Sequence, residues 1–274
     1  MSNLRVQALH VHPVKSVAGT APDEMAVEPW GMSGDRRWAV VDTEGTVITQ
    51  RQQPRLALAA ARPLGGGAVA LSAPGMAELA VQVPEPGPLE PVTLFGKKVE
   101  TVVAASAAAD WFSAYLGVPA RLVHLDDPAV RRPVDPAYAL PGETVSLADA
   151  YPVLLVTLAS LDALNSLIAQ GDHPEEGPLP MNRFRPNVVV AGAEAWAEDG
   201  WRRIAIGDAV FRGVRECGRC IVTTTDQATA ERGKEPLKSL ARHRRIGKSL
   251  AFGRQLVPVR TGTVRVGDEV RVLE

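Results

Sequence analysis

The amino-acid sequence predicts a β-rich α+β protein, built as a barrel or sandwich with peripheral helices. Three observations predict this fold: alternating runs on both sides of turn residues, short runs of β-branched residues, and only a few helical segments. The helices do not alternate regularly with strands, as they would in a doubly wound parallel sheet. At 274 residues, the chain is long enough for one large domain or two modest ones.

Strand signals recur along the whole chain. Residues 37–50 alternate in polarity on both sides of an Asp-Thr-Glu-Gly turn, which predicts a hairpin. The same pattern around Gly-Asp turns predicts hairpins at 202–214 and at 262–274. The β-branched runs at 152–157 and 187–192 are typical of buried strands.

Helix signals are fewer. A helix is predicted over 106–117, with Ser106 as its cap, one apolar face and a terminal glycine. Residues 160–171 repeat that pattern, with Ser160 first and a glycine last. Residues 235–245 are predicted to be helical or turn-like, with a basic end.

Proline-rich sequence divides the chain. We predict an N-terminal domain at 1–125, a Pro-rich linker at 126–144 and a second domain at 145–274. Strands and a helix recur on both sides of this linker, which is why it is preferred as the boundary.

Composition excludes several classes of function. The formal net charge is -1, so no overall field attracts nucleic acid or an anionic membrane. The first residues lack the features of a signal peptide, and no segment approaches the roughly 20 apolar residues of a membrane helix. We therefore predict a cytoplasmic protein with no membrane or nucleic-acid partner. In that compartment, its two cysteines are not expected to form a structural disulfide.

Both cysteines, Cys217 and Cys220, lie in one short segment, "ECGRCIVTTTDQ". Structural zinc needs four ligands, and no second CxxC or HxxxH is present. A redox dithiol usually opens a helix, whereas strand-like residues follow Cys220 here. Taken alone, the two cysteines fit best as small buried hydrophobes.

The neighbours of the cysteines favour a different interpretation. Arg215, Arg219 and Arg232 lie close in sequence, and Gly218 lets the backbone approach a ligand. A soft thiolate among arginines suited to phosphate indicates a metal-bearing, phosphorylated cofactor.

Together with motifs elsewhere in the chain, this cysteine segment resembles the MOSC family, whose members include the mitochondrial amidoxime-reducing component and the C-terminal part of molybdenum-cofactor sulfurase. The C-terminal motifs are "FRPNVVVAG" (184–192), "WAEDGWRRIAIGD" (196–208), "CGRCIVTTTD" (217–226), "KEPLKSLARHRR" (234–245), "GKSLAFG" (247–253) and the terminal "GTVRVGDEV". The N-terminal motifs are "VHPVKSVAG" (11–19), "GDRRWAVVDTEG" (34–45) and "TQRQQPRL" (49–56). The resemblance covers nearly the whole chain. It implies a MOSC β-barrel with peripheral helices, preceded by a β-rich MOSC-associated domain.

The resemblance also implies a molybdenum cofactor, in which molybdenum is held by a molybdopterin and by one protein cysteine. That cysteine would be Cys220, with Cys217 as a neighbour. The cofactor-binding residues implied by the family motifs are Lys15, Ser16, Arg36, Arg185, Asn187 and Arg219. Charge-assisted bonds from Arg and Lys suit a phosphate, and Asn can both donate and accept at a pterin edge. We therefore expect the two halves of the chain to pack around one cleft that these residues line.

The function implied is an oxidoreductase that removes oxygen from N-hydroxylated or N-oxide substrates at a Cys220-ligated molybdenum. Asp149 is a candidate catalytic general acid, because its segment aligns with a family stretch near the cofactor; a turn cap is the alternative. After Cys220, "TTDQATAERG" departs from the family's usual sequence, so the substrate loop is expected to differ. Two rival interpretations remain: a sulfur carrier with a persulfide on Cys220, and a non-catalytic carrier of the cofactor.

Electrons are expected from a separate redox protein. The chain has no GxGxxG after a strand and no cysteine set for an iron–sulfur cluster. The donor would be a ferredoxin, a cytochrome or a reductase. The basic segment "RHRRIGK" (242–248) is a candidate docking site for an acidic donor, and a solvated helix end is the alternative.

Overall fold

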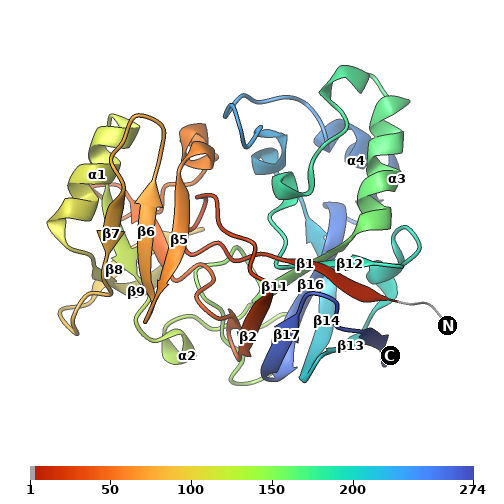
Figure 1. The fold of residues 1–274 in the computed structure, drawn as a ribbon, viewed down its shortest axis with the longest axis horizontal. Coiled ribbons are helices and arrows are strands. Elements are labelled where there is room, and N and C mark those ends of the chain that lie inside the picture. Colours follow the sequence, from red (N-terminus) through yellow and green to blue (C-terminus); the bar gives the residue numbers. More distant parts are fainter. Residues whose placement is uncertain (1–3) are drawn as a thin grey trace.

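The structure, a computed structural model, describes residues 4–274, which form two β-rich lobes side by side (Figure 1). One lobe holds α1 and strands β5 to β9, and the other holds a larger sheet flanked by α3 and α4. The fold is therefore β-rich with few helices, as the sequence predicted.

The larger lobe is built on one sheet that closes almost into a barrel. Its strand order is β1-β12-β11-β16-β14-β13-β18, and β15 pairs with β16. The bounds are β1 (Arg5–Leu9), β11 (Val153–Thr157), β12 (Val188–Ala191), β13 (Arg203–Ile206), β14 (Ala209–Gly218), β15 (Arg245–Ile246), β16 (Ser249–Arg260) and β18 (Val270–Val272). The backbone N–H of Val6 donates to the carbonyl of Asp268 at 2.9 Å, and that of Val270 donates to Leu4 at 2.9 Å. These bonds join the first strand to the last, which leaves few open sheet edges.

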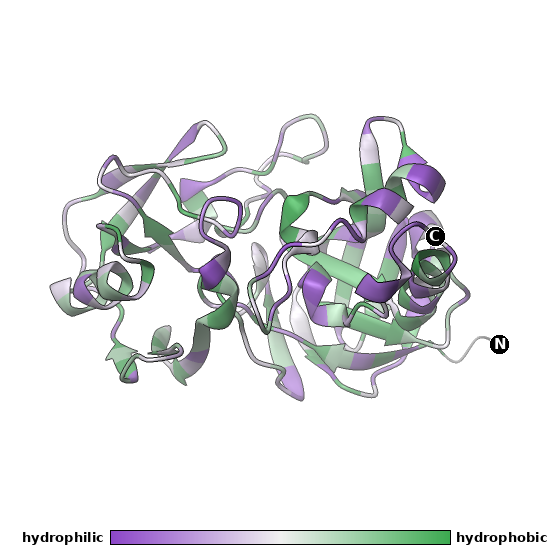
Figure 2. Cartoon of the chain, turned by 90° about the horizontal axis from the view of Figure 1, so that it is seen from above, coloured by the Kyte–Doolittle hydropathy of each residue, from purple (hydrophilic) through white to green (hydrophobic). Residues whose placement is uncertain are grey.

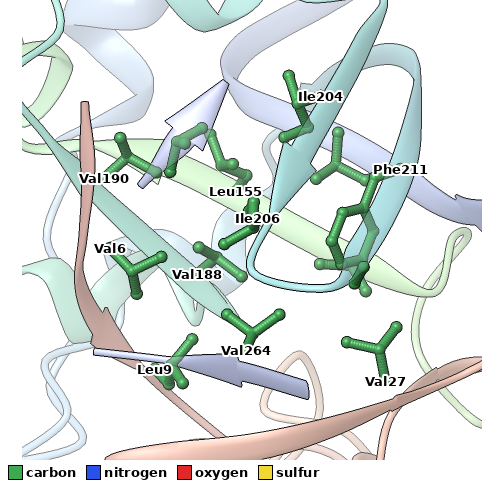
Figure 3. Packing of buried hydrophobic residues seen from close by; sticks show 14 of the residues in the cluster. Val6, Leu9, Val27, Leu155, Val188, Val190, Ile204, Ile206, Phe211 and Val264 are labelled. Carbon is green, nitrogen blue, oxygen red and sulfur yellow. The ribbon is translucent and has the colours of Figure 1, made fainter. Parts of the chain in front are cut away.

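The inside of the barrel is filled by apolar side chains, most of them aliphatic, together with Phe211 (Figure 3). Leu155, Val188, Val190 and Ile204 are completely buried there. Burial of each such side chain contributes about 1.5–3 kcal/mol to folding. The two predicted β-branched strands are thus confirmed as β11 and β12, which pair in parallel.

The smaller lobe contains two antiparallel sheets. One has the order β4-β10-β9-β8 and the other β5-β6-β7. Their bounds are β4 (Trp38–Val41), β5 (Ala60–Gly65), β6 (Ala68–Ser72), β7 (Leu79–Val81), β8 (Glu90–Leu94), β9 (Lys97–Val103) and β10 (Arg121–His124). Trp111, Phe112 and Tyr115 of α1 pack into the core of this lobe.

The helices lie outside the sheets (Figure 1). They are α1 (Ser106–Leu116), α2 (Pro128–Arg131), α3 (Leu158–Ala169) and α4 (Leu237–His243), with 3-10 helices η1 (Pro54–Leu58), η2 (Pro174–Glu176), η3 (Met181–Phe184), η4 (Ala197–Gly200) and η5 (Ile221–Thr224). Two predicted caps were wrong. Ser106 begins α1 without capping it, and the Thr157 hydroxyl, not Ser160, accepts the N–H that caps α3. Gly117 does end α1, at φ 71°.

The predicted hairpin at 262–274 was also wrong. Its two arms, β17 (Gly262–Arg265) and β18, do not pair with each other. β17 instead pairs with β2 (Glu24–Glu28), which pairs with β3 (Gly31–Met32), and β18 pairs with β13. A turn with alternating flanks therefore predicted the strands but not their partners.

The first strands belong to the barrel lobe. β1 pairs with β12, and β2 pairs with β17, so the strands between residues 5 and 32 pack on the C-terminal half. The chain enters the smaller lobe only afterwards and leaves it through residues 126–144. The boundaries predicted from the sequence stay a prediction, but the two halves are joined by shared strand pairing.

Apolar residues follow the strands in the interior, and hydrophilic residues gather in the peripheral loops and helix faces (Figure 2). Among the helices of residues 4–274, none has the length and apolar character needed to cross a lipid bilayer.

His124 on β10 makes stability depend on pH. Its ring packs on Trp38 with centroids 4.4 Å apart, and burial, aided by Arg37, lowers its pKa from 6.5 to about 4. Because the folded pKa is the lower one, the unfolded chain takes up the proton first as pH falls from 6.5 towards 4. Between pH 7 and pH 5 the free energy of unfolding should fall by about 2 kcal/mol from this group. His124→Phe keeps the stacking and should remove that share of the loss, measured by urea denaturation at both pH values. Equal pH dependence in both proteins would contradict this.

Candidate cofactor pocket

A pocket of about 350 Å³ lies between the two lobes. All eight residues predicted from the sequence line it: Lys15, Ser16, Arg36, Asp149, Arg185, Asn187, Arg219 and Cys220. Lys15, Ser16 and Arg36 come from the N-terminal third, and the others come from beyond the linker. The expectation that both halves contribute to one cleft is therefore confirmed, while the role of each residue stays a prediction.

Several pocket residues have an unusual backbone conformation. Ser16, Arg36 and Arg185 have φ values of 67°, 47° and 51°, in the left-handed region. Non-glycine residues cost free energy there and persist where the surrounding structure holds them. In each case the strained residue puts its side chain on the pocket wall, and such strain is concentrated at functional sites.

Arg36 connects the two lobes. Its Nη1 donates to Asn187 Oδ1 at 3.0 Å, and its Nη2 donates to the backbone carbonyl of Arg185 at 3.0 Å. It also forms an ion pair with the buried Asp35, which in turn accepts the backbone N–H of His12 at 2.8 Å. Asn187 bonds further to Leu154 and His10.

A second chain of polar contacts leads to the half-buried Cys220. Lys15 Nζ donates to Asp149 Oδ1 at 2.5 Å. Arg51 Nη2 lies 3.4 Å from Asp149 Oδ2 and 3.2 Å from Cys220 Sγ. Arg51 and Lys15 also lie 5.0 and 5.1 Å from the centre of the Phe95 ring, within cation–π range.

The pocket carries an excess of positive charge. Seven Lys and Arg side chains line it against two carboxylates, those of Asp149 and Glu216. Burial lowers the pKa of Lys15 to about 8, although Asp149 beside it acts in the opposite direction. Burial, together with Arg36, lowers the pKa of Arg185 to about 9. Both cations would gain stabilisation from a bound anion, so the pocket is built for a negatively charged group.

Asp149 does not suit the predicted role of general acid. Its partial burial favours the neutral form, but the charges of Lys15, Arg51 and Arg36 outweigh burial and hold its pKa well below the usual range. The side chain is 58% exposed towards the pocket, so solvent weakens this effect without reversing it. A carboxylate held ionised has no proton to give at neutral pH. Asp149 instead holds Lys15 and Arg51 in place.

The two cysteines lie in different environments. Both are free thiols, Cys217 buried and Cys220 half-buried. Cys217 Sγ accepts from Arg219 Nη1 at 2.9 Å and from Gln255 Nε2 at 3.3 Å, so protein groups already surround it. The strand β14 includes Cys217, and Arg219 N–H continues its ladder to Leu250. A disulfide needs its two Cα atoms within about 7 Å, and this extended backbone disfavours so short a separation between Cys217 and Cys220.

Sequence reasoning missed several residues of the pocket. Arg51, Arg183 and Gln255 line it, and Phe95 contacts two of its cations. Arg51 lies in a motif that the resemblance did include, "TQRQQPRL". Its contact with Cys220 spans 169 residues, so no local pattern signals it. Phe95 carries one signal in the sequence: it precedes Gly96 in a two-residue hairpin turn, where Asn or Asp is usual, and the structure places it there at φ 51°.

These residues fit a phosphorylated cofactor that carries a thiol-binding metal. One half-buried thiol faces the pocket, and thiolates are preferred ligands of soft metals. The surrounding guanidinium groups suit phosphate. The buried Nε of Arg219 and Oε1 of Gln255 on the wall have no partner within residues 4–274, so polar atoms remain for a ligand.

Comparisons with known proteins agree with this chemistry. The description "MOSC N-terminal beta barrel domain" matches residues 3–119, and "MOSC domain" matches 142–271. Mitochondrial amidoxime-reducing component 1 of Homo sapiens is 34% identical, over 98% of this chain and 82% of its own. Mitochondrial amidoxime reducing component 2 of Rattus norvegicus is 33% identical, over 97% of this chain and 82% of its own. Molybdenum cofactor sulfurase of Danio rerio is 31% identical, over 88% of this chain but 30% of its own. The chain therefore belongs to the MOSC family, and it combines an N-terminal MOSC β-barrel domain with a MOSC domain.

Proposed function

We propose that this protein is a molybdenum-cofactor-dependent oxidoreductase that reduces N-hydroxylated or N-oxide compounds. The observation that supports this best is the half-buried Cys220 thiol, which faces a pocket with seven basic side chains. The names of the amidoxime-reducing relatives support the same class of reaction.

Cys220 would hold the metal, and the basic residues of the pocket would hold the phosphate. When bound, such a cofactor supplies the two-electron chemistry that removes an oxygen atom from the substrate. Cleavage of one N–O bond consumes two electrons and two protons and releases one water molecule.

The protein's own residues supply position and charge. Arg51 donates to Cys220 Sγ, and hydrogen bonds to a metal-bound sulfur tune its electronic properties. Asp149 fixes Arg51 and Lys15. Lys15 Nζ, with its pKa of about 8, is a group that can carry a proton near neutral pH.

The test uses protein produced in a molybdate-fed host, with molybdenum measured per chain. Loaded protein should reduce benzamidoxime with a reduced viologen dye as electron source, and it should not do so with NADH alone. The second result follows because the sequence shows no dinucleotide-binding motif.

The outcomes separate the three interpretations. A persulfide on Cys220 without metal would favour a sulfur carrier. Fully loaded protein that stays inert with the dye on N-hydroxy, N-oxide and sulfoxide substrates would favour a non-catalytic cofactor carrier.

A further inference from the structure

The segment from residue 232 to 248 concentrates positive charge. It contains seven Lys and Arg residues and one acidic residue, Glu235, whereas the whole chain has a net charge of -1. Glu235 is buried, and its carboxylate accepts the backbone N–H of Ser239 at 3.0 Å. The exposed face of this segment is therefore almost purely cationic.

Three of the seven cations are already engaged by the protein. Arg242 pairs with Asp172 at 2.8 Å, and Arg244 pairs with Asp199. Arg232 donates to the backbone carbonyls of residues 50 and 51. The sequence-based candidate, 242–248, thus includes two arginines that are already ion-paired.

Four cations are exposed and form no salt bridge within residues 4–274: Lys234, Lys238, Arg245 and Lys248. Arg245 and Lys248 flank the tip of the β15–β16 hairpin, which also carries Ile246, 39% exposed. A second exposed apolar side chain, Ile221 at 43%, directly follows Cys220. On the hairpin, unpaired cations thus lie beside an exposed apolar side chain, a combination typical of a docking surface rather than of a solvated helix end.

This hairpin lies beside the pocket. Arg245 pairs with Leu250 across β15 and β16, and the Leu250 carbonyl accepts the N–H of Arg219 on the next strand at 2.8 Å. Neighbouring strands are about 4.8 Å apart, so the hairpin backbone is roughly 10 Å from the backbone of Arg219, which precedes Cys220. Ser249, next to Lys248, lines the pocket itself.

We propose that the hairpin tip, defined by Arg245, Ile246 and Lys248, is the docking surface for an acidic electron-transfer protein. This inference rests on the proposed function, which requires electrons from outside the chain. Opposite charge favours fast, transient association, and such encounters bury little area, which suits a small surface of two unpaired cations beside the exposed Ile246. The overall charge of -1 does not favour nucleic acid.

The experiment compares the double variant Arg245→Glu/Lys248→Glu with Arg203→Glu/Arg271→Glu, which changes charge equally. Arg203 and Arg271 are exposed, lie on β13 and β18, and do not line the pocket. The electron sources are a reduced viologen dye, an acidic plant-type [2Fe–2S] ferredoxin and a soluble b-type cytochrome. Binding of each protein donor to cofactor-free protein is measured separately by calorimetry.

The hairpin variant should lose about tenfold or more in donor-driven kcat/KM and in donor affinity, and keep the dye-driven rate. The control variant should stay within about twofold in all assays. For the unmodified protein, the donor-driven rate should fall as salt is raised, because screening weakens steering. Donor-driven rates that are equal in the two variants, or dye-driven turnover with no response to either donor, would overturn the docking surface. Binding of the hairpin to anionic vesicles instead of to the donors would also overturn it. A wild-type protein that is inert with the dye would refute the proposed function instead.

Discussion

Cys220→Ser is expected to abolish molybdenum retention. A hydroxyl is a much poorer ligand for a soft metal than a thiolate, and Cys220 is the more accessible of the two thiols in the pocket. The metal bound per chain after purification should fall from near one to near zero, a change of at least about tenfold. Elemental analysis of protein from the molybdate-fed host measures it, and reductase activity should disappear with the metal.

Cys217→Ser is the matched control, since it removes the other thiol of the same segment. Cys217 is buried and already accepts N–H groups of Arg219 and Gln255, which a serine oxygen can also accept. Most of the molybdenum should therefore remain. Equal loss of molybdenum from both variants would contradict the single-ligand hypothesis and indicate that both thiols bind the metal.

The sequence predicted elements well where the signal is local. The β-branched run at 187–192 predicted the strand β12, and its Val188 and Val190 fill the barrel. Gly117 ends α1 because the residue after the helix adopts a left-handed backbone conformation, φ 71°, which glycine adopts without strain. The cap at Ser160 was wrong because Thr157, three residues earlier, is also a good capping residue, and its hydroxyl accepts the N–H of Ser160.

Strand partners could not be predicted locally. The Gly-Asp turn at residues 267–268 resembles the one at 207–208, which does join the paired strands β13 and β14, but β17 and β18 belong to different sheets. Their partners, β2 and β13, lie far away in sequence, and pairing over such separations depends on the whole packing of the two lobes.

The pocket shows the same limit. The family motifs predicted eight residues of one site, because a family resemblance indicates which segments meet in the fold even where they lie far apart in sequence. Arg51 and Phe95 escaped notice, because their importance lies in contacts with Cys220 and Lys15 that only the folded chain creates. Asp149 was placed in the pocket, but its role depends on which cations surround it.

Arg36→Met is expected to destabilise the protein strongly, by about 3–5 kcal/mol. The guanidinium, 12% exposed, is the ion-pair partner of Asp35, whose side chain is 1% exposed. Its loss leaves the buried Asp35 carboxylate without its charge partner. It also removes the hydrogen bonds that Arg36 donates to Asn187 Oδ1 and to the Arg185 carbonyl. Urea denaturation of the cofactor-free protein, followed by circular dichroism, measures the change.

Two further variants decide whether this loss comes from the bridge between the lobes or from charge alone. Arg36→Lys keeps a positive charge near Asp35 but cannot reach two acceptors with a planar fork, so it should lose an intermediate amount, about 1–3 kcal/mol. Arg62→Ala removes an arginine whose partner Glu78 is 64% exposed, and it should change stability by less than about 0.5 kcal/mol. If Arg36→Lys unfolds like the unmodified protein, the hydrogen bonds across the pocket contribute little and the charge of Arg36 suffices. If it unfolds like Arg36→Met, the fork that joins the lobes is the dominant contribution, and the pocket depends on it for its shape.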